Sequence, residues 1–121
     1  MIAWYEIPVA DMTRAQKFYE SILNVTITVN NFGEFVMGLF PDKQTLGQAN
    51  GALVQHNHYV PSQSEGVLVY LSCDDAAIVL GKVEKAGGHV LQPKTEIGDG
   101  HGFMGILKDT EGNRIAVHSN A

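Results

Sequence analysis

The fold is decided by the stretch WYEIPVADMTRAQKFYESIL, residues 4–23. Its first six residues alternate in character, which predicts a short strand with Tyr5, Ile7 and Val9 on one face. We expect that face to pack against a helix, while the opposite face begins at Trp4 and points the other way.

A helix is predicted directly after this strand, over residues 12–23. Asp11 precedes it and has a typical N-cap side chain, whose oxygen accepts from a backbone N–H of the first turn. Apolar residues then recur at helical spacing, with Ala15, Phe18 and Ile22 on one face. The chain therefore opens with a strand, a capping acid and a helix.

The same order recurs 64 residues further along the chain. A strand is predicted over residues 67–73, and Asp75 takes the place of the first capping acid. The second predicted helix covers residues 75–86 and ends at the Gly87-Gly88 pair, a typical C-terminal signal. The chain is thus predicted to contain an internal repeat.

Further strands are predicted after each helix. In the first half they cover residues 25–29, 35–40 and 52–54, and in the second half 89–91 leading to 94–97, 103–107 and 115–118. Each half therefore reads β-α-β-β-β, and the boundary is the polar stretch 57–65. Neither half would bury a sufficient core alone. We expect one α+β domain over residues 1–121, with modules over about 1–57 and about 65–121.

The composition excludes several classes of function. The net charge is −5, and the eight Lys and Arg residues are scattered, so the basic footprint of a nucleic-acid-binding protein is missing. No stretch approaches the roughly 18 apolar residues of a membrane span, and the first residues lack a signal-peptide pattern. Cys73 is the single cysteine, which excludes an intrachain disulfide. We expect a cytoplasmic protein without nucleic-acid or membrane partners.

Residues 4–19 and 102–119 resemble the opening strand–helix unit and the closing hairpin of the vicinal oxygen chelate superfamily. This superfamily contains glyoxalase I, the bleomycin resistance proteins and the extradiol dioxygenases. Within it, the chain is most similar to small bacterial glyoxalase-like proteins related to lactoylglutathione lyase. The resemblance implies two βαβββ modules that form a curled mixed sheet around a cleft, and it implies a homodimer.

Enzymes of this superfamily hold a divalent metal in the cleft with His, Glu or Gln side chains. The resemblance assigns the ligand positions to Trp4, Leu68 and Ala116, and none of these side chains can coordinate a divalent cation. We therefore predict no metal cofactor at these positions. A nonstandard metal set stays open as an alternative, and it would consist of Glu6, His101 and His118.

Alternation along the strands predicts which side chains face the cleft. The candidate catalytic residues are Glu6 and His118, which would set the polar end of a ligand or perform acid–base chemistry. The candidate ligand-binding residues are Trp4, Tyr70, Ser72, His101, Phe103 and Arg114. An exposed or Arg-paired Glu6 and a purely structural His118 stay open as alternatives.

Two functions follow from this predicted cleft. The first is the binding of a small organic molecule in an apolar, aromatic cleft, without the usual metal ligands and in the manner of the bleomycin resistance branch. The second is an enzyme, either metal-dependent or acid–base, that uses Glu6 and His118 as a glyoxalase-I-like lyase or a dioxygenase-like protein would. A module that binds a protein partner is a third alternative.

Overall fold

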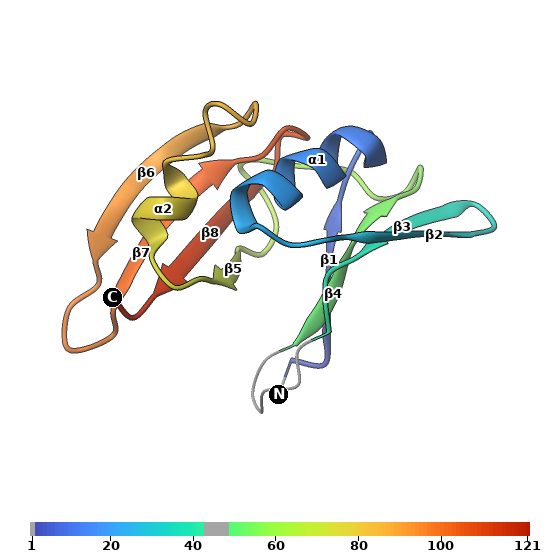
Figure 1. Ribbon diagram of the computed structural model, residues 1–121. Helices are drawn as coiled ribbons and strands as arrows, with labels where there is room; N and C mark the ends of the chain where they lie inside the picture. Colours follow the sequence, from blue (N-terminus) through green and yellow to red (C-terminus); the bar gives the residue numbers. More distant parts are fainter. Residues whose placement is uncertain (1, 43–48) are drawn as a thin grey trace.

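The computed structural model describes residues 2–42 and 49–121 as two four-stranded sheets with one helix each (Figure 1). The first half contains β1 (Trp4–Pro8), α1 (Met12–Leu23), β2 (Thr28–Phe32), β3 (Phe35–Leu39) and β4 (Asn50–Gln55). The second half contains β5 (Val69–Ser72), α2 (Ala76–Leu80), β6 (His89–Glu96), β7 (Phe103–Lys108) and β8 (Arg114–Ser119). The predicted repeat of two βαβββ modules is confirmed.

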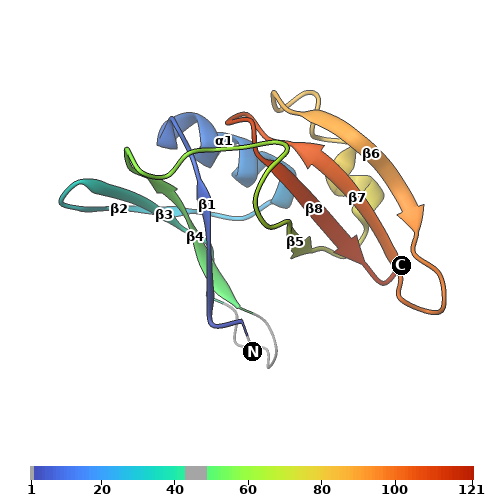
Figure 2. The same cartoon turned by 180° about the vertical axis from the view of Figure 1, so that it is seen from behind.

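The two sheets have the same strand order. The first is ordered β1-β4-β3-β2 and the second β5-β8-β7-β6, so β1 and β5 are equivalent edge strands (Figure 2). Strand β1 runs parallel to β4, and β5 runs parallel to β8. The other neighbouring strands in each sheet are antiparallel. The α+β class expected from the sequence is confirmed.

Both predicted capping acids occupy N-cap positions. Asp11 has extended backbone angles and its carboxylate accepts from the Arg14 backbone N–H at 3.1 Å. Asp75 accepts from the Ala77 backbone N–H at 2.9 Å. At the other end of α1, Asn24 adopts the left-handed conformation with φ 54° and donates its backbone N–H to Glu20 O. Local sequence therefore determines both ends of α1.

The second helix is shorter than predicted. Regular α-helix covers only Ala76–Leu80, and turns replace it over residues 81–87. Gly81 is the C-cap of α2, and glycine is a poor helix former because its backbone loses much entropy on ordering. The turns still bury Val83 completely, so the apolar spacing there reflects packing and not a continuous helix.

Two predicted strand boundaries are also wrong. The strand predicted at 25–29 begins at Thr28, because the left-handed Asn24 redirects the chain before it enters the sheet. The segments predicted at 89–91 and 94–97 form one strand, β6, with irregular register between Val90 and Thr95. Pro93 lies inside it and is tolerated because β6 is an edge strand.

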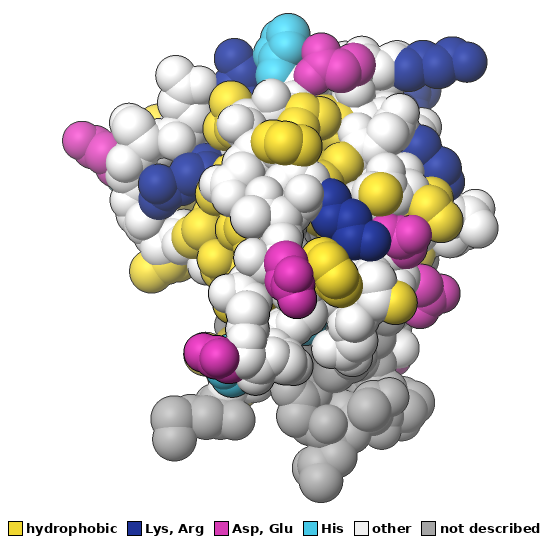
Figure 3. Space-filling view, turned by 90° about the vertical axis from the view of Figure 1, so that its left-hand side faces the viewer, with side chains coloured by type: hydrophobic (Ala, Val, Ile, Leu, Met, Phe, Trp, Pro, Cys, Tyr) yellow, Lys and Arg dark blue, Asp and Glu magenta, His cyan; other side chains and the backbone are white. Residues whose placement is uncertain are grey.

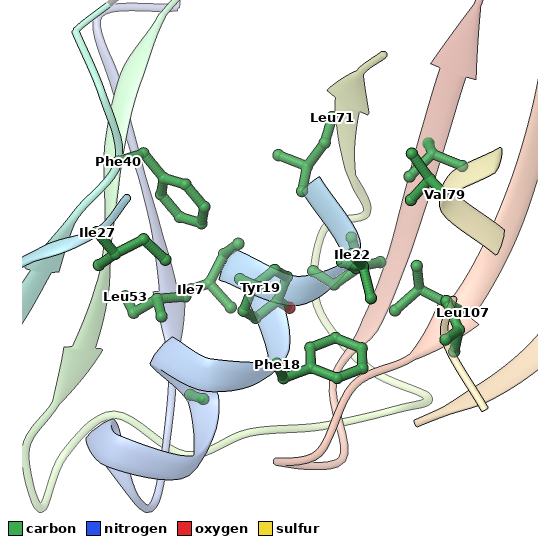
Figure 4. Packing of buried hydrophobic residues seen from close by; sticks show 14 of the residues in the cluster. Ile7, Phe18, Tyr19, Ile22, Ile27, Phe40, Leu53, Leu71, Val79 and Leu107 are labelled. Carbon is green, nitrogen blue, oxygen red and sulfur yellow. The ribbon is translucent and has the colours of Figure 1, made fainter. Parts of the chain in front are cut away.

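The two modules share one hydrophobic core. Helix α1 lies between the two sheets, so that its buried side chains meet residues of both halves (Figure 4). Phe18, Tyr19 and Ile22 are at most 1% exposed. The first half adds Ile7, Ile27 and Leu53 to this core, and the second half adds Leu71, Val79 and Leu107.

A polar contact also joins the modules at the turn between β7 and β8. The Tyr19 hydroxyl donates to Asp109 Oδ2 at 2.5 Å. The Asn113 side-chain amide donates to Pro8 O at 2.6 Å, and Arg14 Nε donates to Glu111 Oε2 at 2.7 Å. The last turn of the second module therefore holds the β1–α1 connection of the first.

Membrane-spanning helices and large charged patches are not expected from the sequence, and the structure can be compared with both expectations. Neither described helix is long and apolar enough to cross a membrane. On the side of the molecule that carries β6, basic, acidic and hydrophobic side chains are interspersed (Figure 3). That face therefore presents no broad patch of a single charge.

Candidate functional site

Each edge strand presents one buried and one exposed face. In β1, Ile7 is 1% exposed and packs in the core, whereas Trp4 is 44% exposed. In β5, Leu71 is 8% exposed and Tyr70 is 51% exposed. The alternation predicted from the sequence is confirmed in both strands, and it places Glu6 and Ser72 on the exposed faces as well.

The structure contains an open groove of about 990 Å³ between β1 and β5, two strands that Figure 1 shows below α1. We call it the inter-module groove, because β1 and the end of α1 line one side and β5 and α2 line the other. Four candidate residues line it: Trp4, Glu6, Tyr70 and Ser72. Much of the remaining wall is apolar and includes Ile22, Val25, Phe40, Val67, Leu68 and Ile78.

The charged side chains that line the groove are mainly acidic. They are Glu6, Asp74, Asp75 and Lys82. Asp75 is held by Lys94 Nζ at 2.9 Å, and this bond, together with the Ala77 backbone N–H, lowers the pKa of the Asp75 carboxyl. The described lining therefore favours a neutral or cationic ligand over an anion.

The Glu6 carboxylate is held by two aromatic side chains. The Tyr59 hydroxyl donates to Oε1 at 2.8 Å, and Trp4 Nε1 donates to Oε2 at 3.2 Å. The hydrogen bond to Glu6 raises the pKa of the Tyr59 hydroxyl. Within residues 2–42 and 49–121, neither a lysine, an arginine nor a histidine forms an ion pair with Glu6. The carboxylate is therefore fixed by neutral donors.

A smaller cavity of about 230 Å³ is lined by β1, by the connection between the modules and by the start of β8. Glu6 and Arg114 both line it, so these two candidate residues are near each other. The Arg114 guanidinium donates to Gly66 O at 3.3 Å, and its backbone N–H donates to Ser62 O. Arg114 thus anchors the segment that connects the modules.

The other three candidates lie apart from the groove. His118 Nε2 is 2.7 Å from His101 O, and because a carbonyl oxygen only accepts, Nε2 must carry the proton. Phe103 lies under Lys94, whose Nζ is 4.5 Å from the ring centroid. Neither histidine lines either of these two cavities, although His118 lies opposite Ser72, a residue of the groove, in the β5–β8 register.

The positions at which the superfamily holds its metal do not fit a metal here. Trp4, Leu68 and Ala116 offer no ligand atom. The sheet register adds a fourth position, because Ala52 lies opposite Glu6 as Ala116 lies opposite Tyr70. Among the residues that the structure describes, no three His, Cys, Asp or Glu side chains are grouped so that they could hold an ion.

Sequence reasoning missed three residues of this site. Asp74 and Lys82 line the groove from the α2 side, and Tyr59 binds Glu6 from the connection between the modules. Tyr59 is the only Phe, Trp or Tyr residue in the polar stretch 57–65, and an isolated aromatic residue in such a connection is the signal that could have pointed to it.

Comparisons with known proteins agree with this architecture. The family profile of the Glyoxalase/Bleomycin resistance protein/Dioxygenase superfamily matches residues 1–117. No curated protein matches the sequence.

Several solved structures share the fold at low sequence identity. A glyoxalase/bleomycin resistance protein from Albidiferax ferrireducens has a TM-score of 0.73 at 14% identity, with 98% of both chains covered. An antibiotic-binding protein from Streptomyces has a TM-score of 0.70 at 18% identity, and the match covers 100% of this chain and 96% of the other. A glyoxalase I variant from Zea mays has a TM-score of 0.72 at 15% identity and covers 98% of this chain, which spans only 46% of the maize chain.

The family profile spans nearly the whole chain, and the structural neighbours share its fold. The chain belongs to the Glyoxalase/Bleomycin resistance protein/Dioxygenase superfamily.

Proposed function

We propose that the protein binds a small, largely apolar organic molecule in the inter-module groove. The observation that carries this proposal is the lining of the groove, where apolar walls surround Trp4, Tyr70 and a few polar side chains, among them Glu6 and Ser72. Ligand sites typically combine a mostly apolar cavity of about 300–1,000 Å³ with a few orienting polar groups. The groove has about 990 Å³ and this composition.

We infer that the protein binds this molecule without a metal ion. The metal positions of the superfamily carry Trp4, Leu68 and Ala116, which leaves a metal without ligands there. The antibiotic-binding protein from Streptomyces is a fold neighbour named for binding and not for catalysis. Acid–base chemistry shared by Glu6 and His118 has less support, because the two side chains do not line a common cavity.

We also propose a cytoplasmic homodimer. The resemblance supports the dimer, and so do exposed apolar side chains on edge strands outside the groove, Phe32 on β2 at 55% exposure and Leu91 on β6 at 52%. Light scattering should give twice the chain mass of 13.1 kDa at tens of micromolar protein. A mass near 13.1 kDa would refute the dimer without affecting the groove.

The binding proposal is tested by calorimetry with 4-tert-butylphenol, a neutral aromatic probe of small size. We expect saturable binding to the wild-type protein. Ser72→Phe should weaken it by about 10-fold or more, because the larger side chain fills the groove where Ser72 lines it. Asn30→Ala, on the exposed strand β2 outside the groove, is the matched control and should bind as the wild type does. Equal binding by Ser72→Phe would exclude the groove as the site.

A further inference from the structure

We propose that the groove selects molecules with an alkylated ammonium group, and that Glu6, held between Trp4 and Tyr59, receives this cation. This inference rests on the proposed binding function and names the chemical class of its ligand. Its basis is the way in which the two aromatic side chains hold the carboxylate.

The position of the Glu6 carboxylate is fixed from two directions. Trp4 lies two residues before Glu6 on the same face of β1, and its indole N–H bonds Oε2. Tyr59 comes from the connection between the modules, 53 residues away in sequence, and its hydroxyl bonds Oε1. Both donors are neutral, so they orient the carboxylate without cancelling its charge.

Among the described residues, Glu6 has no charged partner within ion-pair distance. Neither of the hydrogen bonds to Glu6 comes from a charged group. Glu6 is exposed on β1, so an incoming cation can reach its carboxylate. Asp74 and Lys82 also line the groove and offset each other, and Asp75 is paired with Lys94, so Glu6 leaves the described lining acidic on balance.

The hydrogen bonds also determine what kind of cation fits. Each Glu6 oxygen already accepts one fixed donor, which leaves fewer acceptor positions for the two parallel hydrogen bonds that a guanidinium prefers. A divalent metal needs several ligands, and the described residues supply no group of three. An alkylated ammonium needs few or no hydrogen bonds, and charge together with aromatic surface suffices to bind it.

Aromatic surface is available around the carboxylate. Trp4 is 44% exposed and Tyr70 is 51% exposed, and both line the groove that Glu6 also lines. Cations of this class bind to sites where aromatic rings surround the charge. Trp4 and Tyr59, which both bind the carboxylate, can therefore provide aromatic surface beside the counter-charge of Glu6, and Tyr70 adds a further exposed ring to the same groove.

The test compares two probes of the same shape by calorimetry. The cation is (4-hydroxyphenyl)trimethylammonium, and the neutral isostere is 4-tert-butylphenol. We expect the wild-type protein to bind the cation about 10-fold more tightly than the neutral probe. Glu6→Gln keeps the size of the side chain but removes its charge, so it should reduce this preference to within about 2-fold while the affinity for the neutral probe stays unchanged. Tyr59→Phe should lower the preference less, because it removes one of the two donors that orient Glu6.

Glu34→Gln is the matched control, because Glu34 is an exposed carboxylate that faces His56 and lies outside the groove. It should keep the preference for the cation. Equal binding of both probes by the wild type would overturn the inference and leave the binding function intact. A preference that survives Glu6→Gln would overturn the role of Glu6. Failure of both probes to bind would contradict the binding function and this inference with it.

Discussion

The Tyr19 hydroxyl, on α1 of the first module, lies 2.5 Å from Asp109 Oδ2 in the last turn of the second module. Both residues are buried, and Asp109 also accepts from the Asn113 side chain and from the backbone N–H groups of Glu111 and Asn113. This contact helps the two modules to fold as one unit, which fixes β1 and β5 on either side of the groove.

Loss of this hydrogen bond should destabilise the protein. Tyr19→Phe keeps the ring in the core but removes the donor, so we expect the free energy of unfolding to fall by about 1–2 kcal/mol. Asp109→Ala should cost about 3 kcal/mol or more, because several buried donors lose their acceptor. Urea unfolding measures both changes, with the exposed Glu65→Gln as control. A Tyr19→Phe variant as stable as the wild type would show that the bond contributes nothing.

The carboxylate of Glu111 should make stability depend on acid pH. Burial raises the pKa of this carboxyl, but the hydrogen bonds from Arg14, the Asp11 and Ala10 backbone and Thr110 outweigh burial and leave the pKa below its ordinary value of 4.5. A lowered pKa in the folded state means that the stabilisation is fully present above about pH 4.5 and is lost as the pH falls through the folded-state value.

Glu111→Gln removes this titration. Urea unfolding between pH 3 and pH 7 should therefore show a smaller loss of stability on acidification for the variant than for the wild type. The variant will be less stable at neutral pH, since it loses the ion pair with Arg14. Identical acid slopes for the two proteins would contradict the account.

The N-cap of α1 should contribute measurably to stability. Asp11→Ala removes the acceptor for the Arg14 backbone N–H, and we expect a loss of about 1 kcal/mol. Asp11→Asn keeps an oxygen acceptor and should remain close to the wild type. The Asp11 backbone N–H still donates to Glu111 in either variant, so the comparison isolates the cap. The test fails if alanine and asparagine variants unfold at the same urea concentration.

Metal analysis of untagged protein should find no stoichiometric zinc, nickel or iron. The reason is the chemistry at Trp4, Leu68, Ala116 and the equivalent Ala52, which provide no ligand atom. Treatment with a chelator should accordingly leave the unfolding temperature unchanged. One equivalent of tightly bound metal, lost together with stability on chelation, would require a metal site that the described residues do not form.

Local patterns in the sequence were sufficient to predict the order of the elements and the capping acids. The alternation in β1 and the spacing in α1 reflect contacts made within a few residues. The apolar spacing predicted a helix up to residue 86, but the regular helix α2 ends before Gly81, its C-cap residue. The sequence pattern also separated residues 89–91 from 94–97, which belong to one edge strand, β6, that tolerates Pro93.

The site was harder to predict than the fold. Strand parity places Glu6 and His118 on the outward faces of their sheets, but parity does not say how the two sheets are oriented. Ser72 lines the groove together with Glu6, whereas His118, which lies opposite Ser72 in the β5–β8 register, does not. The contact between Tyr59 and Glu6 joins residues 53 positions apart through an irregular connection, which no periodicity reveals.

The most direct test of the account is an NMR titration of the ¹⁵N-labelled protein with 4-tert-butylphenol. Trp4 is the single tryptophan, so its indole N–H gives one isolated signal inside the groove. The account predicts saturable shifts of this signal and of the Tyr70 and Ser72 amides, with no change at Asn30. Shifts that cluster instead around His101 and His118, or no saturable shifts in the groove, would contradict it.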